Sequence, residues 1–296
     1  MNALAPRLIP GAEVTLEANP ESLNAEHLAV FQSRGGSRLS LGIQTFQEDI
    51  LGCHGRPTRQ RHLDAAKRLA AGWPGALSLD LICGLAGQTE AGQLRDIEEA
   101  LSWNPHHISL YSLTLESGTV LAQQVSRGAA ILPEENEADR WWLMGRDRLE
   151  EAGLGQYEVS NFARSGSESQ HNSRYWALEP WWGLGPSAAS FLDILGRPQY
   201  RTEPSSLESW LKGTAPEAEF PTPLELAKDR LLAGLRRTKG VERLPWADLL
   251  PQTREAWKGR FVEKKERLFL TREALPFLNS FLREAFAELD GRPEFR

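Results

Sequence analysis

The sequence predicts an α/β fold built around a parallel β-sheet. Between Glu13 and Thr114, short apolar runs alternate with stretches that carry helical patterns. Parallel neighbours need a crossover connection, usually a helix, so this alternation is typical of consecutive βαβ units. The apolar runs are EVTLEANP, RLSLGIQTF, ALSLDLICGLAGQT and HISLYSL, at residues 13–20, 38–46, 76–89 and 107–113.

The segments that follow these runs carry the start and stop signals of helices. The first has apolar residues at helical spacing and ends at the pair Gly35-Gly36. The third begins after Thr89, a residue type that commonly caps helix N-termini. The expected helices cover residues 21–36, 59–72, 89–103 and 134–153.

The pattern changes in the second half of the chain. Residues 154–200 are rich in glycine, serine and aromatic residues, which predicts short strands and loops. Prolines then cluster before a mostly helical segment that contains a short apolar run at 268–270. We therefore expect a partial barrel with its closing segment at 1–200 and a small, mostly helical domain at 201–296.

Composition narrows the class of protein. The 296 residues carry a net charge of −6 with a pI near 5.7, which argues against nucleic acid or an acidic membrane as the main partner. Two cysteines cannot form a disulfide framework, and a reducing cytoplasm is the expected location. The N-terminus lacks a signal-peptide pattern, and no apolar run approaches the roughly 20 residues that span a bilayer.

Polar residues at the ends of the predicted strands form the candidate site. Ligands of parallel sheets bind at the carboxyl ends of the strands. Glu17, Gln44, Asp80 and Ser112 are expected at this edge. Asp80 is the strongest candidate, because a carboxylate inside a buried strand is costly unless it is paired or faces a site.

Several motifs in order give the chain a family resemblance. LEANP, GIQTF, HGRPT and LDLICGLAGQT are followed by YSLTLESGT, QYEVSNFAR, QHNSRYW and WWGLGPSAAS. The series resembles the radical S-adenosylmethionine (SAM) haem chaperones and their relatives, the oxygen-independent coproporphyrinogen III oxidases. It covers nearly the whole chain, from Gly11 to Leu289. It implies an incomplete (β/α) barrel of the radical-SAM type and a small helical C-terminal domain.

The resemblance assigns roles to four residues at the strand ends and nearby. Glu17, Gln44, Arg56 and Asp80 match positions that contact SAM in the family. An amide such as Gln44 both donates and accepts hydrogen bonds, and an arginine suits a carboxylate. Three of them also have a purely structural interpretation: Glu17 as a solvated strand end, Gln44 as a cap at the strand end, and Arg56 as a member of a surface ion pair.

The resemblance also exposes a missing motif. Family members hold a 4Fe-4S cluster through three cysteines spaced Cys-x3-Cys-x2-Cys, whereas this chain has Cys53 and Cys83. We expect the sequence to begin at the third barrel strand and to be part of a longer protein; a genuinely shortened relative is the alternative. The chain alone is expected to hold no cluster and to make no radical, so its standing as an enzyme is left open.

The QHNSRYW segment distinguishes two branches of the family. His171, Asn172, Tyr175 and Trp176 match a pattern of the haem chaperones, in which imidazole suits haem iron and aromatic rings cover a porphyrin. A structural hydrogen-bonding role for His171 is the alternative. The implied function is to bind haem or porphyrin and deliver it to recipient proteins, through which membrane contact would arise. Coproporphyrinogen III oxidation and a non-catalytic remnant are the alternatives.

Overall fold

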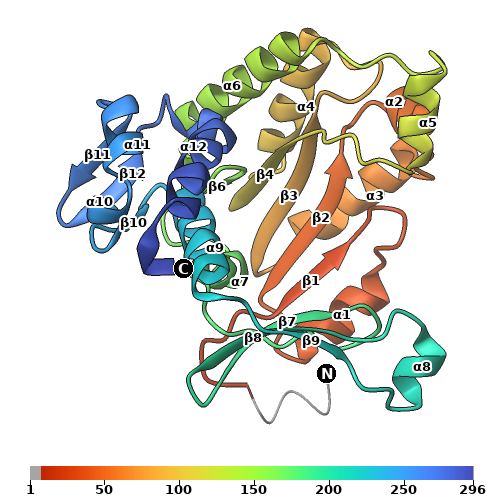
Figure 1. Cartoon of the computed structure of the whole chain (residues 1–296). Helices are drawn as coiled ribbons and strands as arrows, with labels where there is room; N and C mark the ends of the chain where they lie inside the picture. The colour runs from red at the N-terminus through yellow and green to blue at the C-terminus, as the bar shows by residue number, and fades with distance from the viewer. Residues whose placement is uncertain (1–7, 296) are drawn as a thin grey trace. The chain divides into compact units, whose positions relative to one another are not determined.

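The computed structural model describes residues 8–295, which fall into two compact units (Figure 1). The N-terminal unit comprises the chain up to Gln156 together with Ser160–Glu168. The C-terminal unit comprises Tyr157–Val159 and the chain from Ser169 onward. This division by contacts falls earlier than residue 200, and the boundary expected there stays a prediction.

A six-stranded sheet forms the centre of the N-terminal unit, in the order β1-β2-β3-β4-β6-β5. The first four strands are parallel, as the sequence predicts, and β6 and β5 continue the sheet in antiparallel pairing. The expected apolar runs therefore do form βαβ units. The strands are β1 Thr15–Ala18, β2 Arg38–Gln44, β3 Ala76–Cys83, β4 His107–Ser112, β5 Gly155–Gln156 and β6 Asn161–Ala163.

The two faces of this sheet differ in chemistry. Successive residues of a strand point to opposite faces. On β2, Leu39 and Leu41 alternate with Ser40 and Gly42, and β3 and β4 alternate in the same way. The apolar face packs into the unit's core with residues of the helices α3 (Gln60–Ala71), α4 (Glu90–Ser102) and α6 (Glu135–Glu151), while Asp80 lies on the polar face. A site for a polar ligand is thus favoured on that second face.

All four helices expected in this unit are present. Thr89 caps α4 by accepting a hydrogen bond from the Gly92 amide at 3.1 Å, as predicted. Two short helices, α2 and α5, were not predicted, and α5 has no buried residue that would give it an apolar face. The helices are α1 Ala25–Ser33, α2 Glu48–Cys53, α3 Gln60–Ala71, α4 Glu90–Ser102, α5 Val120–Ser126 and α6 Glu135–Glu151.

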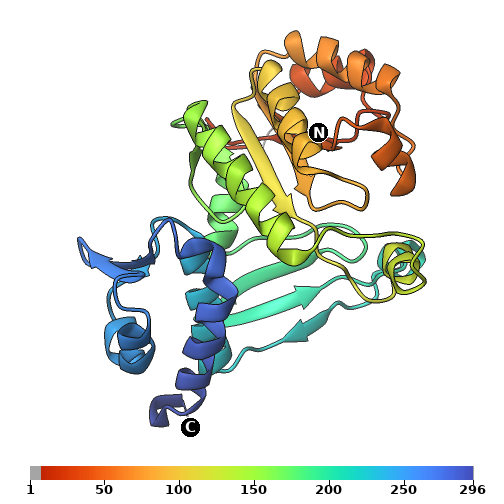
Figure 2. The same cartoon turned by 90° about the horizontal axis from the view of Figure 1, so that it is seen from above.

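The C-terminal unit combines helices with two small antiparallel sheets, ordered β7-β8-β9 and β10-β12-β11 (Figure 2). The short strand expected at 268–270 is confirmed as part of β12. Helix α7 was missed in a segment that the sequence assigned to strands and loops. The elements are α7 Gln170–Trp176, β7 Ala189–Ile194, β8 Arg197–Thr202, α8 Leu207–Leu211, β9 Glu217–Glu219, α9 Pro223–Arg236, β10 Val241–Glu242, α10 Trp246–Leu249, α11 Pro251–Ala256, β11 Phe261–Lys264, β12 Arg267–Leu270 and α12 Leu278–Asp290.

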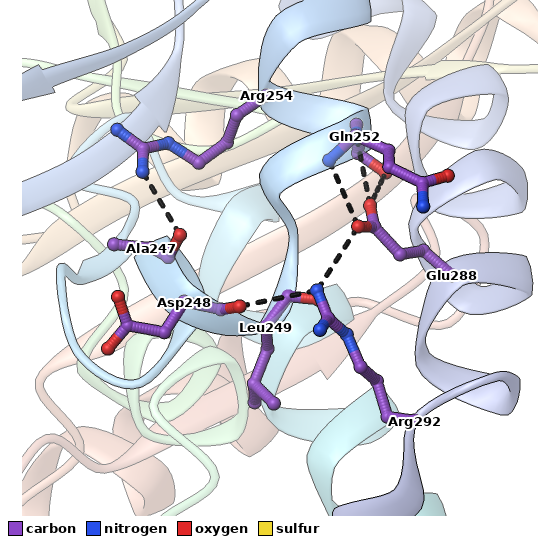
Figure 3. Close-up of polar contacts among 8 residues, drawn as sticks. Ala247, Asp248, Leu249, Gln252, Arg254, Glu288 and Arg292 are labelled. Atoms are coloured by element: carbon purple, nitrogen blue, oxygen red, sulfur yellow. Dashed lines mark hydrogen bonds and ion pairs between the residues drawn. The ribbon is translucent and has the colours of Figure 1, made fainter.

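A carboxylate on α12 holds the start of α11 in place (Figure 3). Glu288 accepts hydrogen bonds from the backbone amides of Gln252 and Thr253 at 3.0 and 2.8 Å, so it satisfies donors that a helix N-terminus leaves unpaired. Arg292 donates to Glu288 at 3.3 Å and to the Leu249 carbonyl at 2.9 Å. The pair thereby connects α12 to both α10 and α11. No helix among residues 8–295 has the length and apolarity needed to cross a bilayer.

Candidate functional site

The carboxyl ends of β1, β2 and β3 enclose an open cavity of about 280 Å³. Three of the residues expected at this edge line it, namely Glu17, Gln44 and Asp80. Ser112, at the end of β4, is not part of the lining. The other lining residues are Ala18, Asn19, Ser40 and Gly42.

Asp80 lies on the polar face of the sheet between two strands that both donate to it. The Ser109 hydroxyl on β4 donates at 2.7 Å and the Ser40 hydroxyl on β2 donates at 3.3 Å. Burial raises the pKa of Asp80, and the charge of Glu17 acts in the same direction, against the two serines and Arg38. A carboxylate that is costly to keep charged is stabilised by a cationic or hydroxyl-bearing ligand.

Gln44 reaches the cavity because β2 is irregular at this point. The register with β3 shifts between Gly42 and Gln44, and Gln44 has a left-handed backbone with φ of 68°. Such a conformation is uncommon for a residue with a side chain and occurs often at functional sites. A Cβ on Gly42 would lie 2.9 Å from the Gln44 Nε2 atom and 3.0 Å from the Asn19 Oδ1 atom. Glycine at this position therefore leaves room for the side-chain amides of Gln44 and Asn19 close to the backbone of β2.

Arg56 does not line the cavity but contacts Asn19, which does. It lies in the loop after α2, and its Nη1 donates to the Asn19 Oδ1 atom at 3.4 Å. The sequence missed Asn19 and Ser40 as lining residues. The alternation along β2 would have placed Ser40 on the face of Asp80, whereas Asn19 lies beyond β1 and carries no periodic signal.

The four residues of the predicted haem motif lie on α7, in the C-terminal unit. Their side chains do not form one cluster. The rings of His171 and Tyr175 meet edge to face, with centroids 4.6 Å apart, and Tyr175 continues to Trp181 at 4.5 Å. The backbone amide of Asn172 donates to the hydroxyl of Ser169, the N-cap of α7, at 3.2 Å. Trp176 instead packs against the guanidinium of Arg236, 4.3 Å from the ring centroid. His171 and Trp176 thus face different neighbours.

The two cysteines do not fit an iron–sulfur cubane. Cys83 is buried on β3, where burial and the charges of Asp139 and Asp96 raise the pKa of its thiol to about 12. Cys53 is exposed on α2. Within residues 8–295 no group of three histidine, cysteine or acidic side chains is placed to hold a metal ion. Cys53 and Cys83 therefore do not supply the three thiolates that such a cluster needs.

Known relatives identify the family. Residues 2–101 match the radical SAM superfamily. A radical S-adenosyl methionine domain-containing protein 1 from Danio rerio is 32% identical over 94% of this chain and 68% of its own length. The chain belongs to the radical SAM family. That membership implies SAM and a 4Fe-4S cluster as the cofactors of the family.

Other relatives of this radical SAM chain are named as haem chaperones. Heme chaperone HemW of Synechocystis is 37% identical over 86% of this chain, and HemW of Bacillus subtilis is 34% identical over 80%. The chain spans 62% and 63% of their lengths. In three dimensions, coproporphyrinogen III oxidase HemN of Escherichia coli matches 95% of this chain and 70% of its own, with a TM-score of 0.74 at 18% identity. This match confirms the predicted fold class.

Proposed function

We propose that this chain binds haem and contributes to its delivery to recipient proteins. The observation that carries the proposal is the His171–Tyr175 pair on α7, supported by two relatives named heme chaperone HemW. An exposed imidazole whose orientation is fixed by a neighbouring ring is a suitable ligand for haem iron. Tyr175 also contacts Trp181, which ties α7 to the segment that follows it. The delivery of haem to recipient proteins belongs to this proposal as well. Two free cysteines support a reducing compartment such as the cytoplasm.

The cavity of the N-terminal unit is proposed to hold SAM. SAM carries an ammonium group, a carboxylate and ribose hydroxyls, and in the complete family its cleavage supplies a radical. Asp80 and Glu17 suit the ammonium group or the hydroxyls, while Gln44 can donate and accept. Arg56 is within reach of the same edge through Asn19 and suits the carboxylate.

Titration with haemin tests the proposed function. Wild-type protein should give a Soret band that differs from that of free haemin, and His171→Ala should shift the band and weaken binding about ten-fold or more through loss of the iron ligand. His27→Ala, which removes an exposed histidine of the N-terminal unit, is the matched control. An unchanged spectrum in His171→Ala would remove the ligand assignment. Absence of haemin binding by the wild type would remove the function itself.

Oxidation of coproporphyrinogen III is the second candidate, favoured by the HemN-like fold. That reaction needs a cluster, and neither Cys53 nor Cys83 is placed to hold one. The haem-binding proposal needs no cluster within these residues and therefore ranks first. A stable haemin complex formed without iron–sulfur reconstitution would separate the two candidates.

A further inference from the structure

The C-terminal unit contains an open cavity of about 750 Å³, which is within the roughly 300–1,000 Å³ of typical ligand sites. It lies beside Trp176 and is bounded by α9, β10 and α10. Much of its lining is apolar, with side chains from each of these elements. The apolar lining includes Leu226, Ala227, Val241, Trp246 and Leu249.

Three arginines, Arg230, Arg237 and Arg267, line this apolar cavity. Among residues 8–295, the guanidinium of Arg237 has neither a hydrogen-bond nor an ion-pair partner, although it is half-buried. Arg267 is fixed, because it donates to the backbone carbonyls of Lys239 and Gly240 at 2.6 Å each. One acidic side chain, the exposed Glu242, is found in the described lining. The cavity therefore carries an excess of positive charge.

The charges around Arg237 do not balance within the unit. Burial and the nearby Arg267 both lower the pKa of Arg237, and Glu179 opposes them. Glu179, however, is already paired with Arg174 at 3.0 Å. An arginine stays protonated in proteins, so two guanidinium groups close together are stabilised by an external anion, best by carboxylates that accept two parallel bonds.

Trp176 supplies a rigid aromatic wall to the same cavity. Arg236 packs over its ring and is itself paired with the fully buried Glu158 at 3.3 Å. The indole nitrogen is buried without a hydrogen-bond partner among the residues that the structure describes. A ring held in this way provides a surface for a flat, apolar ligand.

The part of the lining that α10 contributes is also held in place (Figure 3). Leu249 of α10 lines the cavity, and Arg292 donates to its carbonyl at 2.9 Å and to that of Asp248 at 3.2 Å. Glu288 fixes Arg292 in turn. Groups positioned before binding lower the entropy cost of holding a ligand.

We propose that this cavity binds a planar macrocyclic ligand with an apolar ring system and carboxylate side chains. Arg237 and Arg267 would face the carboxylates of the ligand, and Trp176 would cover its ring system. The proposal rests on the proposed haem-binding function and deepens it, because it assigns a site for the propionate-bearing part of the tetrapyrrole. His171 does not line this cavity. Iron coordination and carboxylate binding can therefore be removed separately.

Three ligands test the assignment with the full chain. These are haemin, metal-free protoporphyrin IX and the dimethyl ester of protoporphyrin IX, each followed by quenching of tryptophan fluorescence. Arg237→Gln should weaken haemin and protoporphyrin IX about ten-fold, since it removes a charged hydrogen-bond donor, and should leave the ester unaffected. His171→Ala should weaken haemin alone. Leu226→Trp should weaken all three ligands by filling the cavity.

Arg243→Gln is the matched control, because it removes the same charge from an arginine that is paired with Glu263 at 3.0 Å and does not line the cavity. It should leave binding unchanged, and thermal melting of each variant checks folding. If the wild type binds haemin while Arg237→Gln and Leu226→Trp bind it equally well, the cavity assignment fails and the haem function stands. Equal weakening of the ester in Arg237→Gln would also overturn the carboxylate assignment. A wild type that binds none of the ligands removes both proposals.

Discussion

The two units present cavities of opposite character. The N-terminal cavity is small, is lined by amides, a serine and two carboxylates, and lies at the ends of parallel strands. The C-terminal cavity is larger, largely apolar, and lined by three arginines. The first suits a compact ligand with a positive charge and many polar groups, and the second suits a large flat ligand with negative charges. This difference is what the proposed SAM site in the first cavity and the proposed tetrapyrrole site in the second require.

The origin of the difference lies in how each cavity is built. Asp80 and its serine partners belong to neighbouring strands, so backbone register alone brings them together. Arg237 follows the end of α9 and Arg267 lies on β12, so their approach depends on the packing of the whole unit. A substitution in the N-terminal cavity should therefore change only the residues beside it. In the C-terminal cavity, substitutions that disturb the packing of the surrounding helices and strands should also change the position of the arginines.

The largest effect is expected for Gly42→Val in the N-terminal cavity. Even a Cβ at this position would crowd the amides of Gln44 and Asn19, at 2.9 and 3.0 Å, and a valine would displace both. SAM binding, measured by calorimetry, should fall beyond detection, on the order of 100-fold or more. Haemin binding should be unchanged.

Gly52→Val is the matched control for this substitution, since a Cβ on that α2 glycine would meet open space. SAM binding that survives Gly42→Val would contradict the assignment of this cavity. A simultaneous loss of haemin binding would contradict the separation of the two sites.

A smaller effect, on stability, is expected for Glu288→Gln in the C-terminal unit. The substitution weakens hydrogen bonds from Gln252 and Thr253 and the pairing with Arg292. Charged hydrogen bonds of this kind contribute about 1.5–3 kcal/mol, so the free energy of unfolding should fall by about 2 kcal/mol. Hydrogen exchange of α11 and α12 should increase with it. Arg237→Gln should leave this exchange unchanged. If exchange were also unaltered in Glu288→Gln, the hydrogen bonds of Glu288 would not hold α11 and α12 together.

The parallel sheet was predictable because its signal is local. Each strand is an apolar run that closes on turn or polar residues, and Thr89 marked the start of α4. Asp80 was also predictable, because a charge within a buried strand is expensive. The structure places Glu17, Gln44 and Asp80 around one cavity, although their contacts with SAM stay a prediction.

Much of the C-terminal unit was not predictable in this way. Helix α7 has no buried residue, so its sequence lacks an apolar face that would distinguish it from a loop. Arg237 and Arg267 look like ordinary surface charges in the sequence, and nothing in their spacing connects them. A fold brings such residues together through tertiary packing, which a periodic pattern does not encode.

The smallest effect we predict is that the contributions of Asp80 and Glu288 to the stability of the fold depend on pH in opposite directions. Burial raises the pKa of Asp80 above its unfolded value, so its contribution to stability is full at low pH and is lost as pH rises through the folded pKa. Partial burial of Glu288 acts to raise its pKa, but hydrogen bonds from Gln252 and Thr253 and the charge of Arg292 lower it overall. Its contribution is therefore present above the unfolded pKa and is lost as pH falls through the folded value.

Asp80→Asn should accordingly stabilise the N-terminal unit slightly at neutral pH, on the order of 1 kcal/mol, and this gain should vanish as the solution is acidified. Glu288→Gln should do the reverse, with a loss at neutral pH that disappears in acid. Urea unfolding at a series of pH values, read by hydrogen exchange at β3 and at α12, measures the two units in the same sample. If both variants changed stability with the same sign of pH dependence, the burial cost at Asp80 would be outweighed by its bonds to Ser40 and Ser109. Asp80 would then be a structural anchor of the sheet, and the case for a ligand beside it would rest on Gly42 and Gln44 alone.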